Sequence, residues 1–191
     1  MYVVAFNGSP RRNGNTAAML NMVLEELNAA DVRTELVQLG GLHLRGCRAC
    51  FGCASRKDGR CAVQDDELNA LIEKMLDADA ILIGTPTYFT DVTTEVKALI
   101  DRAGLATRVS GNLLRHKLGA AVVAVRRAGS IHAFDTINHF FLISEMMVVG
   151  SSYWNMGIGH QPGEVVDDAE GEATMRTLGQ NMAWALDKLG G

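Results

Sequence analysis

Short apolar runs alternate with amphipathic segments along the chain, which indicates that strands and helices follow one another. We expect β-strands at the apolar runs over residues 2–6, 34–39, 80–83, 118–125 and 146–149. Apolar residues recur at helical spacing over residues 15–29, 68–75, 92–103, 134–144 and 167–189, and these segments are predicted to be helices. The acidic pairs Asp65-Asp66 and Asp167-Asp168 are interpreted as helix starts.

The predicted strands are apolar throughout, which is typical of strands that are covered on both faces. Because strands and helices also alternate strictly, the pattern predicts a parallel sheet with helices on both faces, a three-layer α/β fold. Five strands suit the flavodoxin-like order 2-1-3-4-5, in which ligands bind at the carboxyl ends of the strands near the point where the order reverses. The chain has no internal repeat or linker, and we expect one domain over residues 1–191.

Composition narrows the class of partner. The formal net charge is −4 and no basic tail is present, so we expect neither nucleic acid nor a membrane as a partner. No run approaches the about 18 apolar residues of a membrane span, and no cationic segment precedes the first apolar run. We therefore expect a cytoplasmic protein that binds small molecules.

The loop after the first predicted strand, residues 8–16 with the sequence GSPRRNGNT, leads directly into a helix. Exposed backbone N–H groups and the helix dipole favour an anion at such a point, and the side chains of Ser9, Arg11, Asn15 and Thr16 add donors. The loop lacks the lysine of a Walker A motif and the G-x-G-x-x-G pattern of a dinucleotide site. A terminal monophosphate is the better fit, and a simple turn with a helix cap is the alternative.

Two further loops are predicted at the same edge of the sheet. Residues 84–91 carry the adjacent aromatics Tyr88 and Phe89, which suit the edge or face of a planar ring, or equally a packed loop or subunit contact. Residues 126–130, with the sequence RRAGS, can bring a cation and a close backbone contact to the same ligand.

All four cysteines of the chain lie in a segment rich in glycine and arginine, residues 43–64, which we expect to form a loop. They are Cys47, Cys50, Cys53 and Cys61, a C-x2-C-x2-C-x7-C array. Such a triplet with a later fourth cysteine is more typical of a four-iron cluster than of zinc. The surrounding arginine and lysine side chains would stabilise thiolates. Free or redox-active thiols and a zinc site are the alternatives.

Four segments in this order together resemble the iron-sulfur flavoprotein branch of the NAD(P)H-dependent FMN reductase family, which has a flavodoxin-like fold. They are residues 8–16, the cysteines followed by Asp65-Asp66, residues 84–89 before VKALIDR at 96–102, and GSSYWN at 150–155. The resemblance spans nearly the whole chain. It implies that FMN binds Ser9, Arg11, Asn13, Gly14, Asn15, Thr16, Pro86, Thr87, Tyr88, Phe89, Arg127 and Gly129, and that the four cysteines ligate a 4Fe-4S cluster.

The resemblance also implies a homodimer or homotetramer that brings each cluster near a flavin. The function expected from it is electron transfer by FMN between NAD(P)H or ferredoxin and a small acceptor such as a quinone, a flavin or an oxygen species. The alternatives are a non-catalytic electron carrier, an FMN oxidoreductase without a cluster, and a zinc-stabilised binding module. No side chain is assigned as a nucleophile, because the five histidines lie in no catalytic motif.

Overall fold

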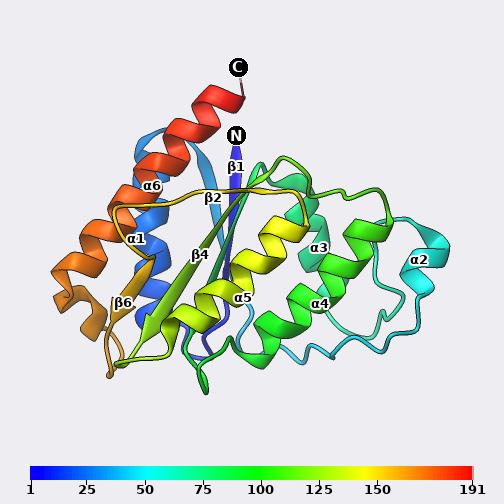
Figure 1. Ribbon diagram of the computed structural model, residues 1–191, viewed down its shortest axis with the longest axis horizontal. Helices are drawn as coiled ribbons and strands as arrows, with labels where there is room; N and C mark the ends of the chain where they lie inside the picture. The colour runs from blue at the N-terminus through cyan, green and yellow to red at the C-terminus, as the bar shows by residue number, and fades with distance from the viewer. Residues whose placement is uncertain (191) are drawn as a thin grey trace.

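The computed structural model describes residues 1–190 and has the predicted α/β architecture (Figure 1). Gly191, the last residue of the expected domain, lies outside the described part. The strands are β1 (Tyr2–Asn7), β2 (Arg33–Gln38), β3 (Ala80–Pro86), β4 (Leu118–Val125), β5 (Met147–Val148) and β6 (Met156–Ile158). The α-helices are α1 (Asn15–Ala29), α2 (Gly52–Arg56), α3 (Leu68–Asp77), α4 (Thr94–Val109), α5 (Ser130–Ile143) and α6 (Ala169–Leu189), and η1 (Glu164–Asp167) is a 3₁₀ helix.

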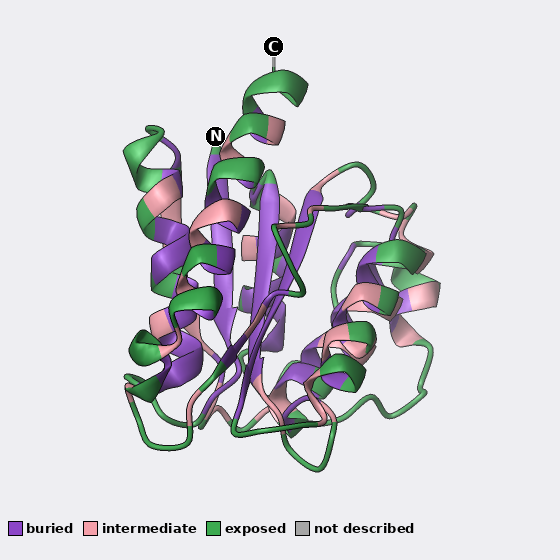
Figure 2. Cartoon of the chain, turned by 60° about the vertical axis from the view of Figure 1, so that its left-hand side comes forward, coloured by how far each residue is buried: buried purple, intermediate pink, exposed green. Residues whose placement is uncertain are grey.

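The sheet is parallel and has the predicted order β2-β1-β3-β4-β5, with β6 also paired to β4. Helices α1 and α6 cover one face, and α3, α4 and α5 cover the other (Figure 1). The central strands are buried along almost their whole length (Figure 2). Two apolar layers, one on each face, hold the sheet, and this explains why the central strands β1, β3 and β4 are apolar at almost every position, whereas the outer strand β2 carries Arg33, Glu35 and Gln38.

The fifth strand differs from the prediction, because its place at the edge of the sheet is shared by two short strands. β5 pairs with the start of β4 through Leu118 and Met147, whereas β6 pairs with the end of β4 through Val125 and Ile158. Residues 149–155 leave the sheet between them and carry the GSSYWN segment. A strand of three residues is too short to show a hydrophobic period, so β6 was not predicted.

Helix boundaries match the sequence pattern to different degrees. Helix α1 begins and ends as predicted, whereas α5 begins earlier than expected, directly after Gly129, whose φ of 87° marks the end of the preceding loop. Helix α6 begins at Ala169 because the Asp168 side chain caps it by accepting the Gly171 N–H at 3.0 Å. This confirms Asp167-Asp168 as a helix start. Within residues 1–190, no helix is long and apolar enough to cross a membrane.

The cysteine segment, residues 43–64, lies between β2 and α3 in sequence and runs outside α4, where it carries α2 at the far right of Figure 1. It was predicted as a loop without regular structure, but it contains the short helix α2. Phe51 before this helix and Lys57 after it have φ angles of 55° and 53°. Two left-handed residues therefore turn the chain sharply on either side of Cys53.

Candidate functional site

A pocket of about 170 Å³ opens at the carboxyl ends of β1, β3 and β4, next to the point where the strand order reverses. Three chain segments that follow these strands supply most of its wall, and a fourth, after β6, closes it. The lining residues are Ser9, Arg11, Asn15, Thr16, Pro86, Thr87, Tyr88, Ala124, Val125, Arg126, Gly159 and His160. Ligands of open α/β sheets bind at this position.

The first loop is fixed to its neighbour before α1 begins. The Gly8 N–H donates to the Gly84 carbonyl at 2.8 Å, and the Thr93 hydroxyl donates to the Gly8 carbonyl at 3.0 Å. A Cβ at position 8 would lie 2.2 Å from Val96 Cγ2, so only glycine fits there. The Ser9 side chain then accepts the Arg11 N–H at 3.2 Å, which makes the turn into the helix.

The N-terminus of α1 suits an anion. Its N-cap is Gly14, which has no side chain to satisfy the first N–H groups, and its first turn holds no acidic residue. The helix dipole therefore acts on the pocket without a competing carboxylate in that turn. Thr16 is buried beside these N–H groups, and the exposed Arg11 adds a cation. This donor set fits a phosphate group, as predicted.

Asn15 lines the pocket, but its side chain is occupied by a distant segment. Its Oδ1 accepts the N–H groups of Gly163 at 2.8 Å and Val165 at 3.3 Å. Its Nδ2 donates to the Gln161 carbonyl at 3.0 Å. The amide thereby ties the segment after β6 to α1, next to the point where Gly159 and His160 enter the pocket. Sequence reasoning missed Gly159 and His160 because no local pattern signals a contact over such a separation.

The loop after β3 places its two aromatics differently. Tyr88 and Asp91 exchange backbone hydrogen bonds at 2.9 and 3.0 Å, and Phe89 and Thr90 between them have φ angles of 48° and 66°. This tight turn leaves the Phe89 side chain fully exposed and outside the pocket, whereas Tyr88 lines it. Thr87 is held by its N–H, which donates to the Ala124 carbonyl at 2.9 Å.

The other predicted flavin ligands do not line this pocket. Arg127 lines a second pocket of about 160 Å³ beside Trp154 and Asp168, and its neighbour Arg126 lines the main pocket instead. Gly129 packs against the loop after β3, since a Cβ there would lie 2.9 Å from Thr90 Cγ2. Asn13 and Gly14 belong to the turn before α1 but not to the pocket wall. The seven predicted residues that do line it are Ser9, Arg11, Asn15, Thr16, Pro86, Thr87 and Tyr88.

The four cysteines are free thiols at different depths. Cys47 and Cys50 are exposed, whereas Cys53 on α2 and Cys61 after it are buried. Among residues 1–190, no three His, Cys, Asp or Glu side chains form a group able to hold a metal ion, so the structure does not gather the predicted ligands. An open pocket of about 500 Å³ lies beside Cys50 and is lined by Arg48, Cys50, Ala62, Val63, Gln64 and Asp65.

A buried ion pair anchors this segment to α4. The Arg102 guanidinium holds both carboxylate oxygens of Asp66, through Nη1 to Oδ2 and through Nη2 to Oδ1 at 3.0 Å. The two side chains are 0% and 1% exposed. Asp66 was predicted only as a helix start. It does accept the Leu68 N–H at 3.3 Å, but the N-cap is Glu67, and the main partner of Asp66 is Arg102.

The environment of this pair keeps both groups charged. Burial acts to raise the pKa of Asp66, but the hydrogen bonds from Arg102 and from the Arg45 N–H outweigh it, and the pKa lies below its ordinary value. Burial likewise acts to lower the pKa of Arg102, but its contacts with Asp66 and Cys61 raise it above the ordinary value. Both shifts favour the charged forms of the two groups.

Three of the basic residues that were expected to surround the thiols have carboxylate partners of their own. Arg45 pairs with Asp65 at 3.1 Å and Arg56 with Asp58 at 3.2 Å. Arg60 pairs with Glu73 on α3. The cation in direct contact with a cysteine is Arg102, whose Nε donates to Cys61 Sγ at 3.3 Å. Arg102 belongs to the VKALIDR motif, but sequence reasoning gave it no role.

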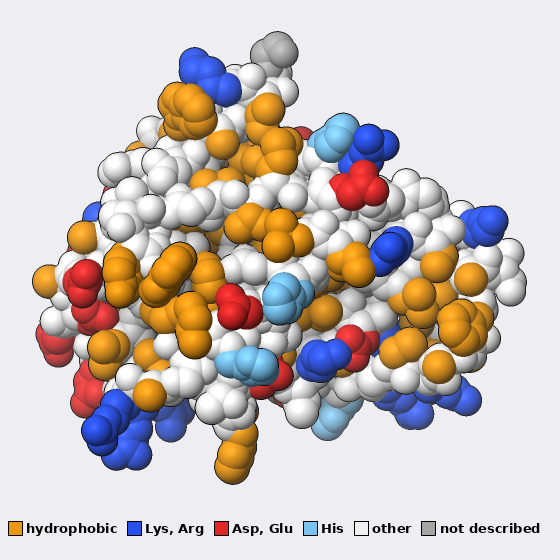
Figure 3. All heavy atoms as spheres, viewed as in Figure 1, with side chains coloured by type: hydrophobic (Ala, Val, Ile, Leu, Met, Phe, Trp, Pro, Cys, Tyr) orange, Lys and Arg blue, Asp and Glu red, His pale blue; other side chains and the backbone are white. Residues whose placement is uncertain are grey.

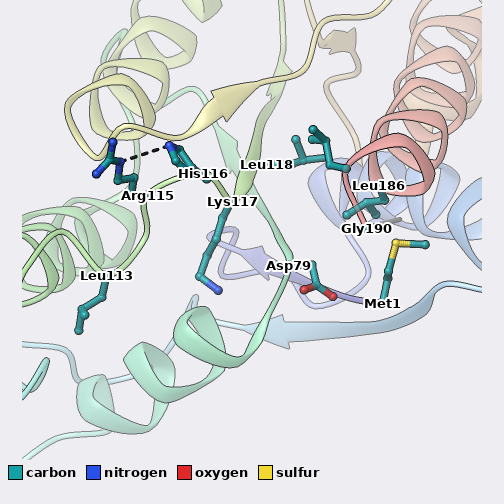
Figure 4. Close-up of a pocket in the computed structure, with 10 residues that line it drawn as sticks. Met1, Asp79, Leu113, Arg115, His116, Lys117, Leu118, Leu186 and Gly190 are labelled. Carbon is teal, nitrogen blue, oxygen red and sulfur yellow. Dashed lines mark hydrogen bonds between the residues drawn. The ribbon is translucent and has the colours of Figure 1, made fainter.

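A pocket of about 290 Å³ lies at the opposite end of the sheet, between the starts of β1 and β4 and the end of α6 (Figure 4). Its polar side chains are used within the fold. Lys117 Nζ donates to the carbonyls of Leu76, at 2.8 Å, and Ala78, and Arg115 pairs with Glu145 at 2.9 Å. Because parallel sheets bind ligands at the carboxyl ends of their strands, the site after β1, β3 and β4 is the better candidate.

The chain is similar to known proteins in sequence and in fold. Residues 1–161 match the family described as NADPH-dependent FMN reductase. An iron-sulfur flavoprotein of Methanocaldococcus jannaschii is 35% identical over 190 residues, which cover 96% of each chain. The solved structure of a flavone reductase superposes with a TM-score of 0.74 over 100% of this chain and 64% of its own, at 19% identity. A flavodoxin-like WrbA-like protein from Agrobacterium tumefaciens gives a TM-score of 0.66 over 98% and 97%, at 16% identity.

Proposed function

Since this chain belongs to the NADPH-dependent FMN reductase family, we propose that it binds FMN at the carboxyl ends of β1, β3 and β4 and uses it to oxidise NADPH or NADH. The observation that carries the proposal is the uncapped N-terminus of α1, which opens on a pocket beside the loops after β3 and β4. An anion-binding helix end next to a polar loop with an aromatic side chain suits a phosphate joined to a planar ring.

Different residues of the pocket would bind the phosphate and the ring of FMN. Ser9, Thr16 and Arg11 lie at the helix end and would hold the phosphate. Pro86 to Tyr88 would border the ring, and Arg126 and His160 close the other side. Bound FMN would supply hydride acceptance from a reduced nicotinamide and release of electrons one at a time. The chain itself then needs only to position the flavin and leave one side of it open.

We propose further that Cys47, Cys50, Cys53 and Cys61 ligate one 4Fe-4S cluster. Support comes from their spacing, from the four free thiols, one of which, Cys61, accepts a hydrogen bond from a buried guanidinium, and from the name of the Methanocaldococcus relative. Cys47 and Cys50 lie on exposed chain without regular structure, and this part of the segment has room to close around a metal centre.

An apolar surface supports the proposal of a homodimer or homotetramer. Hydrophobic side chains gather over β6 and the segment that leads to it (Figure 3). The exposed apolar residues there and on the neighbouring end of α5 are Leu142, Ile143, Met147, Val148, Tyr153, Trp154 and Ile158. Large apolar side chains exposed together on one face, such as Tyr153 and Trp154, mark an interaction site. The proposed electron donors are NAD(P)H and reduced ferredoxin, the proposed acceptor is a small molecule such as a quinone, and the proposed location is the cytoplasm.

The test is purification without oxygen, followed by an absorption spectrum, flavin identification and iron and sulfide counts. We expect one FMN per chain, bound iron and sulfide, and multiple-turnover oxidation of NADPH or NADH with a quinone. Arg11→Met should weaken FMN binding, whereas the adjacent Arg12→Met, outside the pocket wall, is the matched control. Protein without flavin would refute the proposal, and bound cofactors without multiple turnover would favour an electron carrier instead.

A further inference from the structure

We propose that Arg102, clamped by Asp66, is a positioning residue that fixes Cys61 and closes the cysteine segment into a metal-binding loop. This inference rests on the proposed cluster. Arg102 lies outside the cysteine segment, in the middle of α4, and its Nε reaches the Cys61 sulfur from that helix.

The guanidinium uses all of its donors on one short stretch of chain. Nε donates to Cys61 Sγ at 3.3 Å, Nη1 to the Arg45 carbonyl at 3.0 Å, and Nη2 to the Val63 carbonyl at 3.1 Å. The remaining two hydrogen bonds go to Asp66. Arginine has five N–H donors, so none is left without a partner. A fully buried arginine is rare, and complete pairing is what permits it here.

The partners of Arg102 bracket the cysteines. Arg45 precedes Cys47, whereas Val63 and Asp66 follow Cys61. One side chain therefore joins the two ends of the stretch that contains all four thiols. Closing a loop in advance removes conformational freedom that a bound group would otherwise have to restrict. The segment is thus organised at its ends, while Cys47 and Cys50 stay exposed between them.

Cys61 is held at both its backbone and its sulfur. Asn69 on α3 accepts the Cys61 N–H at 2.8 Å and donates to the Cys61 carbonyl at 3.1 Å. The charged Nε–H of Arg102 then points at the sulfur. A neutral thiol is a weak acceptor, whereas a metal-bound sulfur carries negative charge, so a charged donor suits the ligand state. Of the four proposed ligands, Cys61 is therefore the one whose backbone and sulfur are both held in place before a metal binds.

The alternative is that Arg102 only neutralises the charge of the buried Asp66. The two roles predict different iron binding in a double variant. Arg102→Met with Asp66→Leu removes both charges and leaves no buried ion, so a neutralising role predicts that iron binding recovers. A positioning role predicts that iron binding stays weak, because Cys61 still lacks its partner.

The experiment uses protein purified without oxygen and measures iron, sulfide and FMN per chain, together with the rate at which iron passes to a chelator. For Arg102→Met and for the double variant we expect iron to be lost about 10- to 100-fold faster than from the natural protein, as for other groups that orient metal ligands. Arg102→Lys keeps the positive charge but loses the planar set of five N–H donors, so its rate of iron loss should lie between those of the natural protein and Arg102→Met. The exposed Arg108 of the same helix supplies the control Arg108→Met, with unchanged iron.

FMN content reports independently on the fold, because the flavin pocket contains neither residue. In the metal-free protein, mass spectrometry after alkylation should show Cys61 reacting faster in Arg102→Met than in the natural protein. Iron retained at the natural rate in Arg102→Met, or recovered in the double variant, would overturn the inference. So would equal or slower alkylation of Cys61 in metal-free Arg102→Met, because the inference requires the buried thiol to become accessible. Natural protein without iron would refute the proposed cluster instead, and the alkylation result would still decide the role of Arg102.

Discussion

Asp66→Asn should destabilise the protein far more than the same change at the neighbouring Asp65. Asp66 is 1% exposed and meets a guanidinium that is 0% exposed. The substitution leaves that guanidinium buried without a counter-charge, and breaking such a pair costs about 3–5 kcal/mol. Asp65 pairs with Arg45 at 56% and 62% exposure, where the loss should stay below about 1 kcal/mol.

Thermal and urea unfolding of the metal-free, flavin-free proteins measures this difference without help from bound groups. A chain of 191 residues loses about 2–4 °C of melting temperature per kcal/mol, so Asp66→Asn should melt about 6–20 °C lower. Replacing both partners by apolar residues, as in Asp66→Leu with Arg102→Met, should recover much of the loss. Equal midpoints for Asp66→Asn and Asp65→Asn would refute the reasoning.

The same pair fixes the direction of the pH dependence. The pKa of Asp66 in the folded protein lies below its ordinary value, which is about 3.9 in the unfolded chain. Its stabilisation is therefore fully present above that unfolded value and is lost as the pH falls toward the lower pKa of the folded state. The gap in stability between the natural protein and Asp66→Asn should narrow below about pH 4. A gap that stayed constant down to that range would contradict the assignment.

Three further changes test the flavin pocket and the proposed oligomer. Gly8→Ala places a Cβ 2.2 Å from Val96 Cγ2 and should lower both stability, by about 1–3 kcal/mol, and FMN affinity in titration. Gly46→Ala has open space and is its control. Asn15→Ala removes three hydrogen bonds to the segment after β6 and should cost about 1–3 kcal/mol in urea unfolding, because the freed backbone groups lose their partner. Trp154→Glu should shift the mass measured by light scattering toward that of the monomer. Trp184→Glu changes a more exposed tryptophan on α6 and should leave the mass unchanged. An unchanged mass for Trp154→Glu would count against this interface.

Local patterns predicted what depends on neighbours in sequence. The central strands could be predicted because β1, β3 and β4 bury both faces. The phosphate loop could be predicted because Ser9, Arg11 and Thr16 lie close together in sequence where a strand gives way to a helix. Contacts between residues far apart in sequence produce no local pattern, so they could not be predicted. Nothing near Arg102 signals Cys61, and nothing near Asn15 signals the loop at Gly163. Arg126 and Arg127 show the same limit, because adjacent arginines look alike in sequence but line different pockets.

Helix α4 joins the two proposed redox sites through packing. Thr93 at its N-cap and Val96 in its first turn hold Gly8, at the start of the flavin loop. Arg102 of the same helix holds Cys61. Arg102 lies six positions after Val96, which corresponds to a rise of about 9 Å along the helix. Because an α-helix is stiff over two turns, α4 alone sets the distance between the flavin loop and Cys61. A change at Arg102 should therefore release the cysteine segment while the flavin loop keeps its support, so iron loss with FMN retained is the signature that α4 predicts.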